Sequence, residues 1–231
     1  MHARGAGRHN QAVTSSAHST ESISPDKLLA ATPAVRRRLD LSRPVPRELV
    51  EDCLRLALQA PTGGSRQTWH FLVIADAGKR NAIGEFYKRA WYAHNAARFR
   101  DYAPGDIRGE RLDKLVDSAR YLADHMHEVP LMVLACIEGR TEKAATARVA
   151  AQFASIYPAV WSFMLAARTR HLGTVLTTAH LDYEREVADV LGIPYERVMQ
   201  AALVPVAYFL GEDLRPSPRL PLESVTHWDS W

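Results

Sequence analysis

Apolar residues recur every three or four positions over residues 46–60, which places them on one face of an α-helix, and five further stretches also favour helices. Helices are therefore predicted over residues 25–32, 46–60, 79–100, 110–128, 145–170 and 183–191. Ser24 caps the first helix, Pro25 is its first residue, and Gly192 ends the last helix. The helix over 145–170 is small and apolar almost all round, which predicts burial on every side. It is either the central helix of the fold or part of a subunit interface.

Short continuous apolar runs bounded by turn residues predict buried strands. Such runs occupy residues 69–75, 130–137 and 199–210, and residues 174–178 form a short strand or an extended loop. Gly173 follows the long helix and is predicted to end it in the left-handed conformation. Residues 215–221 hold three prolines and fit neither a helix nor a central strand. The tail also carries two tryptophans, which need a surface to bury them, such as that of a partner chain.

The composition is typical of a globular protein, with 47% apolar and 24% charged residues among 231. This length suits one large domain or two small ones. The formal net charge of +3 is too small to indicate nucleic-acid binding. Cys53 and Cys136 lie in apolar runs without a CxxC motif, so buried thiols in a reducing compartment are expected.

The remaining expectations from composition concern location. No apolar run approaches 18 residues, and the N-terminus lacks the apolar core of a secretory signal. A cytoplasmic protein without membrane contact is therefore expected. Residues 1–24 are polar, have no hydrophobic period, and are predicted to be a flexible extension that covers part of a neighbouring subunit.

Two stretches carry candidate chemistry. Arg36, Arg37 and Arg38 are adjacent, so at most two of them face one anion from an extended segment. The run is either a solvated basic surface or a phosphate clamp. Residues 60–71, Ala-Pro-Thr-Gly-Gly-Ser-Arg-Gln-Thr-Trp-His-Phe, join a helix to a strand. They form either a surface turn or a loop whose backbone a planar polar ligand approaches closely.

Several common catalytic patterns do not occur in the sequence. There is no GxGxxG, GxxxxGK[ST], HExxH or GxSxG, which argues against the usual dinucleotide fold, phosphate-loop enzymes, zinc proteases and α/β-hydrolases. His125 and His127 are two positions apart and point away from each other on a helix, so a metal site is not expected there. His180 is expected to be structural rather than a substrate contact.

The order and spacing of the arginine run, the glycine loop and an arginine in the tail resemble the FMN-dependent nitroreductase family. That family carries R-S-x-R followed by an acidic residue and P-V-P, then A-P-S-x-x-N-x-Q-P-W-x-F, G-L-G-T and K-x-R-x-P-x-E-x-V. The matching segments are residues 33–46, 60–71, 171–174 and 217–225. The ending Val-Thr-His-Trp is similar to mycobacterial members, and the resemblance covers residue 25 to the end.

The resemblance implies an α+β fold with a mixed, mostly antiparallel sheet flanked by helices, in an intertwined homodimer with FMN at its interface. Residues 25–231 would form a single FMN-binding domain whose C-terminal arm, 211–231, extends over the partner subunit. Arg36 and Arg219, with Arg38 as a further candidate, would hold the phosphate. The loop would line the ribityl chain and ring, and 177–178 would approach flavin N5 and O4. The implied flavin contacts are Arg36, Arg38, Pro61, Thr62, Gly63, Ser65, Gln67, Thr177, Thr178 and Arg219.

Three positions depart from the family motifs. Pro33-Ala34 stands in place of Arg-Ser, Ser65 in place of Asn, and Ser217 in place of Lys. Some contacts to the flavin phosphate are therefore expected to come from other residues. The candidates are Arg37, Arg38 and Arg215.

The implied activity is an FMN-dependent NAD(P)H oxidoreductase that reduces nitroaromatic or quinone-type substrates by ping-pong hydride transfer through flavin N5. NADPH is expected over NADH, because a 2′-phosphate needs a basic partner and the chain is rich in arginine. A backbone N–H near 177–178 is expected to donate to N5, and no catalytic side chain is required. The alternatives are a flavin-binding or storage protein with low turnover, another flavin reaction on this fold, or a nucleic-acid-binding protein.

Overall fold

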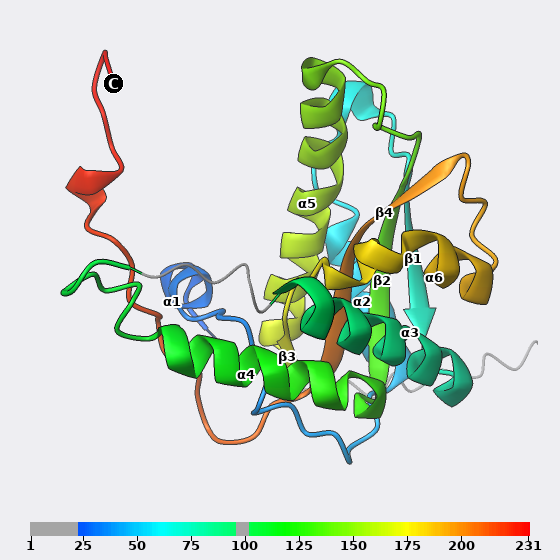
Figure 1. Cartoon of the computed structure of the whole chain (residues 1–231), viewed down its shortest axis with the longest axis horizontal. Coiled ribbons are helices and arrows are strands. Elements are labelled where there is room, and N and C mark those ends of the chain that lie inside the picture. Colours follow the sequence, from blue (N-terminus) through cyan, green and yellow to red (C-terminus); the bar gives the residue numbers. More distant parts are fainter. Residues whose placement is uncertain (1–22, 96–101) are drawn as a thin grey trace, which may run out of the picture.

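The computed structural model describes residues 23–95 and 102–231, so nearly all of the predicted extension lies outside the described residues. One sheet has the order β1-β2-β4-β3, with helices on both faces (Figure 1). Its strands are β1 (Trp69–Ile74), β2 (Leu131–Glu138), β4 (Val198–Tyr208) and β3 (Leu172–Thr174). The predicted α+β class with a mostly antiparallel sheet is confirmed. Every strand pair in the described residues is antiparallel, so the sheet shows no mixed character there.

Two apolar cores lie on opposite faces of the sheet, because side chains alternate along each strand. On β2, Met132 and Leu134 belong to one core, whereas Leu131 and Val133 belong to the other. The first core is closed by α3 (Ala77–Ala90), α4 (Leu112–His125) and α6 (Glu184–Leu191). The second is closed by α2 (Arg47–Ala57) and α5 (Thr146–Arg168). Burial of both faces explains why the central strands are continuous apolar runs in the sequence.

Most predicted helices agree with the structure to within a few residues. The first helix is α1 (Pro25–Ala30), and the Ser24 hydroxyl accepts from the Lys27 backbone N–H at 3.3 Å, as the predicted cap requires. Gly192 ends α6 in the left-handed conformation, with a φ of 70°. The helix predicted over 79–100 differs, because α3 ends at Ala90 and continues as a π-helical turn (Trp91–Asn95). Residues 96–101 lie outside the described part.

Two local predictions were wrong. The left-handed residue after α5 is His171, with a φ of 57°, and Gly173 lies inside β3. Glycine is needed there for space, because a Cβ would lie 2.9 Å from Cγ1 of Val35 and 3.1 Å from Cδ2 of Leu39. The strand predicted as buried over 69–75 is an edge strand with an exposed His70, because only β2 pairs with it.

The long helix α5 also departs from two expectations. By length and composition it could cross a membrane, so the statement that no apolar run approaches 18 residues was wrong. A core helix passes the same test, and Ile156 and Phe163 of α5 are buried between α2 and the sheet. In the single chain α5 is not buried on every side. A row at helical spacing is exposed, namely Ala147, Ala150, Ala151, Ala154 and Trp161.

Cys53 and Cys136 are buried as expected, and burial raises their thiol pKa values to about 11 and about 12.

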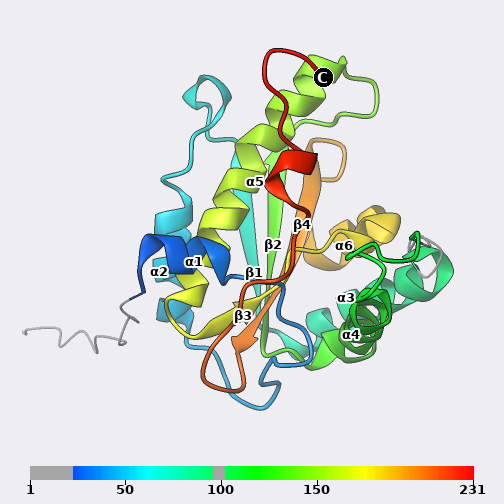
Figure 2. The ribbon, with the colours of Figure 1, turned by 90° about the vertical axis from the view of Figure 1, so that its left-hand side faces the viewer.

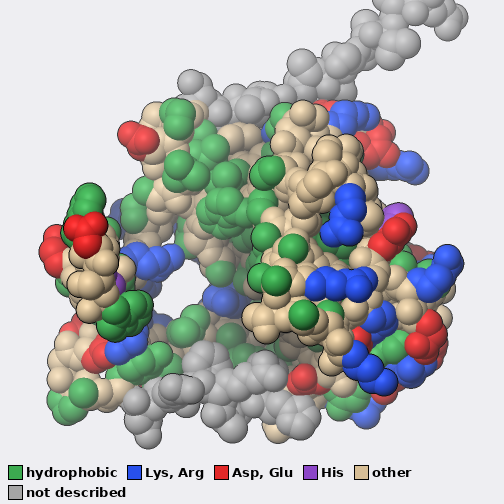
Figure 3. All heavy atoms as spheres, turned by 90° about the horizontal axis from the view of Figure 1, so that it is seen from above, with side chains coloured by type: hydrophobic (Ala, Val, Ile, Leu, Met, Phe, Trp, Pro, Cys, Tyr) green, Lys and Arg blue, Asp and Glu red, His purple; other side chains and the backbone are tan. Residues whose placement is uncertain are grey.

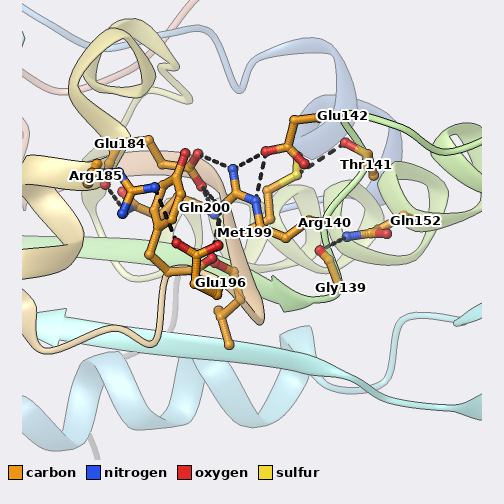
Figure 4. A network of polar contacts seen from close by, with 12 residues as sticks. Gly139, Arg140, Thr141, Glu142, Gln152, Glu184, Arg185, Glu196, Met199 and Gln200 are labelled. Carbon is orange, nitrogen blue, oxygen red and sulfur yellow. Dashed lines mark hydrogen bonds and ion pairs between the residues drawn. The ribbon is translucent and has the colours of Figure 1, made fainter.

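A polar network anchors the loop after β2 (Figure 4). The Arg140 guanidinium donates to Glu184 at 2.7 Å, at the start of α6, and also to Glu142. Burial by itself would lower the pKa of Arg140, but hydrogen bonds to the two carboxylates outweigh it and raise the pKa. Gln152 of α5 donates to the backbone carbonyl of Gly139 at 2.7 Å. The network thus fixes the starts of α5 and α6 relative to the sheet.

Candidate functional site

Three distant parts of the chain line a hollow of about 750 Å³ beside the C-terminal arm. The N-terminal segment contributes Arg36, the loop before α4 and the start of α4 together contribute most of the wall, and the arm contributes Arg219. Five described lining side chains are basic and none is acidic, and we call this space the basic hollow. The basic residues are Arg36, Arg108, Arg111, Lys114 and Arg219. Figure 3 shows an opening between the arm and the body of the molecule, bordered by Lys and Arg side chains.

A second space, of about 260 Å³, adjoins the first and is called the aromatic hollow. Tyr87 and Trp91 line it together with Thr177 and Thr178, and Arg36 lines both hollows. The Thr177 hydroxyl donates to the Tyr87 hydroxyl at 3.1 Å. Burial raises the pKa of Tyr87, so its phenol stays protonated near neutral pH. The fold therefore brings together four of the predicted site residues: Arg36, Thr177, Thr178 and Arg219.

Arg37 and Arg38 are engaged in structural contacts. Arg37 pairs with Asp117 of α4, with 2.6 Å between Nη2 and Oδ2. Arg38 donates to the backbone carbonyls of Leu210 at 2.6 Å and Asp213 at 2.9 Å. These bonds fix the root of the arm to the N-terminal segment. Any contact of Arg38 with a flavin phosphate, which stays a prediction, would compete with them.

Arg36 differs from both neighbours, because no carboxylate of the described residues pairs with it. Arg36 is half-buried, and burial lowers the pKa of its guanidinium while the Tyr87 hydroxyl partly opposes the shift. Guanidinium remains charged even with a lowered pKa. A partly desolvated cation without a carboxylate partner is unfavourable by itself and is well placed to hold an anion. Of the three arginines, Arg36 thus has the environment that a ligand contact needs.

The glycine loop lies on a different part of the molecule. Gly63 donates its backbone N–H to the Ser155 hydroxyl of α5 at 3.0 Å. Thr62 and Gly63 line a third space of about 240 Å³ with residues from the N-terminal half of α5. In Figure 2 the loop stands beside that half of the helix, away from the start of α4.

The loop conformation is unusual. Gly64, Ser65 and Gln67 all have positive φ values, of 60°, 53° and 50°. Such values are strained for residues other than glycine, and strain of this kind clusters at functional sites. The side chains of Pro61, Ser65 and Gln67 are exposed, so they are available to a ligand or another chain.

One chain does not bring the loop to Arg36. Val35 donates its backbone N–H to Thr174 at 2.9 Å, which places the arginine run just beyond the C-terminal end of α5. The loop contacts α5 at Ser155, thirteen residues before the last helical residue, Arg168. At the usual rise per residue this is a separation of about 20 Å along the helix. The predicted site residues therefore form two groups, one beside the N-terminal half of α5 and one just beyond its C-terminal end.

His180 follows the two threonines and is completely buried. Neither ring nitrogen has a hydrogen-bond partner in the described part of the chain. Burial disfavours the charged imidazolium and lowers the pKa from 6.5 to about 3. The side chain lines neither hollow, which agrees with the expected structural role.

We expect acid to weaken the fold through His180. Between pH 6.5 and about 3 the unfolded chain binds a proton at this imidazole and the folded chain does not, so stability falls as the pH falls. The loss is about 2 kcal/mol between pH 6.5 and 5. Urea unfolding at pH 7 and pH 5 measures it, and His180→Leu should remove most of this loss. An equal loss in wild type and His180→Leu would show that the imidazole is not responsible.

The comparisons with known proteins agree with this architecture. The sequence model of the nitroreductase family matches residues 34–208. A protein named NADH dehydrogenase from Thermus thermophilus is 26% identical over 216 residues, covering 86% of this chain and 95% of that protein. The structure of an iodotyrosine deiodinase bound to FMN and 3-iodo-L-tyrosine has a TM-score of 0.65 and 22% identity, over 89% of this chain and 99% of that one. A nitroreductase-like protein from Bacillus cereus has a TM-score of 0.63 and 17% identity, over 92% and 100%.

The chain therefore belongs to the nitroreductase family of flavin-dependent oxidoreductases.

The sequence analysis did not predict that residues of α4 line the basic hollow. Arg111, Lys114 and Ser118 recur at the spacing of one helical face, which is the signal that could have revealed it. Of the described residues, none form a group of three or more His, Cys, Asp or Glu side chains that could hold a metal ion.

Proposed function

We propose that the protein is an FMN-dependent NAD(P)H oxidoreductase that reduces small nitroaromatic or quinone-type substrates. The observation that carries the proposal is Arg36, a half-buried cation with no carboxylate partner among the described residues. It lies where the basic hollow meets the aromatic hollow. This arrangement suits a ligand with a phosphate at one end and a planar ring at the other.

The residues present fit FMN in charge and in chemical type. Arg36 and Arg219 would hold the phosphate in the basic hollow, and Tyr87 and Trp91 would flank the ring and exclude water. The Thr177 backbone N–H already donates to the Leu203 carbonyl at 3.0 Å. The donor to the flavin ring is therefore assigned to the backbone N–H of the next residue, Thr178. Bound FMN would supply hydride acceptance from NAD(P)H and electron transfer to the second substrate.

The proposal includes a homodimer that completes the site. The loop residues Pro61, Thr62, Gly63, Ser65 and Gln67 are proposed to reach the flavin held by a partner subunit, because about 20 Å of α5 separates them from Arg36 within one chain. The exposed apolar row on α5 supplies a surface for a second copy. The C-terminal arm leaves the body and carries Trp228 and Trp231, 85% and 102% exposed, which suits burial on a partner (Figures 1 and 2).

The visible spectrum of the purified protein tests the proposed function. We expect a yellow protein whose flavin absorption is bleached by NADPH without oxygen and restored by a nitroaromatic compound or a quinone. The same experiment with NADH measures the donor preference. A protein that holds flavin but is bleached by neither donor, while dithionite bleaches it, would be a flavin-binding or storage protein instead. A protein that holds no FMN would remove the proposal altogether.

A further inference from the structure

One helical face of α4 forms a wall of the basic hollow. Lys114, Leu115 and Ser118 of α4 line the hollow on one side of the helix, and Arg111, the N-cap residue of α4, lines it three positions before Lys114. Opposite them lie Pro33 and Ala34 of the N-terminal segment and Arg219 of the arm. Residues from α4 therefore face the position at which the family's first basic motif would supply its contacts.

The basic hollow holds more positive charge than nearby carboxylates of the described residues neutralise. Arg108 is balanced, because it donates to both carboxylate oxygens of Asp106, at 2.6 Å from Nη2 and at 3.0 and 3.2 Å from Nε. In the described part of the chain, Arg111 and Lys114 have no ion pair, and Arg219 has only a bond to the carbonyl of Pro218 at 3.1 Å. Neighbouring like charges on one helical face repel each other. An anion between α4 and the arm would relieve that repulsion.

The charge of a flavin phosphate matches this surplus. A phosphate monoester carries about −1.5 to −2 charges near neutral pH and offers three strong acceptor oxygens. The family's Arg-Ser pair is replaced by Pro33-Ala34 and its tail lysine by Ser217, all of which line the same hollow. The residues expected to compensate are not placed to do so. Arg37 and Arg38 make structural contacts, and Arg215 lines neither hollow.

We infer that Arg111, the residue that precedes α4, and Lys114 of α4 bind the FMN phosphate in place of the missing motif residues, together with Arg219 of the arm. The inference rests on the proposed FMN site and assigns its phosphate contacts to a helix that the sequence motifs do not include. It makes α4 part of the cofactor site. The affinity for FMN should then exceed that for riboflavin, which lacks the phosphate, chiefly through these side chains.

The test compares FMN with riboflavin on flavin-stripped protein, with dissociation constants measured by quenching of flavin fluorescence. The variant is Arg111→Gln with Lys114→Gln. The matched control is Lys79→Gln with Lys143→Gln, which removes the same charge from exposed positions outside both hollows. We expect the variant to lower the preference for FMN over riboflavin about 100-fold. The control should keep the wild-type preference to within about two-fold.

An unchanged preference for FMN over riboflavin in the variant would overturn the inference. A variant that still prefers FMN over riboflavin but no longer prefers NADPH over NADH would also overturn it. In that case Arg111 and Lys114 would bind the 2′-phosphate of NADPH instead of the FMN phosphate. Bleaching by NADPH is scored separately. If the variant loses its preference for FMN but the wild-type flavin is not bleached by NADPH, the inference stands and the proposed function fails. If NADPH bleaches the wild-type flavin but the variant prefers FMN as the wild type does, the proposed function stands and the inference fails.

Discussion

Replacement of Arg36 with methionine is expected to lower the affinity for FMN about 100-fold while leaving the empty fold at least as stable as the wild type. The two effects have opposite signs because Arg36 is partly desolvated yet has no carboxylate partner in the described chain. Methionine fills a similar volume without a buried charge, so the penalty disappears together with the ligand contact. Fluorescence titration with FMN and thermal unfolding of the stripped protein measure the two quantities.

Arg37→Met is the matched control, because Arg37 is the adjacent cation and its guanidinium pairs with a half-exposed Asp117 instead. Its affinity for FMN should stay within about two-fold of wild type, since exposed ion pairs contribute little. The assignment of Arg36 fails if both variants bind FMN as the wild type does. It also fails if Arg36→Met unfolds at a much lower temperature, because the arginine would then be part of the core.

A heterodimer of two chains that are each defective in flavin binding is expected to bind flavin again, provided that each chain carries a different substitution. One chain carries Arg36→Met and the other carries Ser65→Glu, which places a charged side chain at an exposed position of the loop. If each site takes Arg36 from one subunit and the loop from the other, a heterodimer of these chains has one intact site of its two. Heterodimers isolated through two different affinity tags should therefore hold FMN in about half of their sites.

The opposite arrangement provides the control. A chain carrying both substitutions, paired with a wild-type chain, should have no intact site, because each site then receives one altered group. If every chain built its own site, the pattern would reverse: this second heterodimer would keep one site and the first would keep none. Flavin content per dimer, read from the absorption spectrum, separates the two arrangements. The exposed row on α5 and the distance between the two groups of site residues favour the shared site.

The secondary structure was largely predictable because it depends on local rules. The capping of α1 by Ser24 and the left-handed Gly192 after α6 follow from side chains that act within a few residues. The central strands were recognised because burial of both faces leaves a continuous apolar run. The predicted role of Gly173 was wrong because contacts with residues distant in the sequence determine which residue fits there. Gly173 is set by contact with Val35 and Leu39, which no local pattern reveals.

The candidate site divides in the same way. The sequence by itself determined the family, the basic run and the glycine loop, because these are defined by residue type and spacing, whereas the positive φ values of Ser65 and Gln67 came from the structure. Only the tertiary structure distinguished the three adjacent arginines, since their partners come from α4, from the arm, or from no carboxylate of the described residues. It likewise brought Arg111 and Lys114 to the hollow where Pro33 and Ala34 replace the family's contacts. Charge at a site depends on which side chains the packing of distant segments brings together, and spacing along one segment does not contain that information.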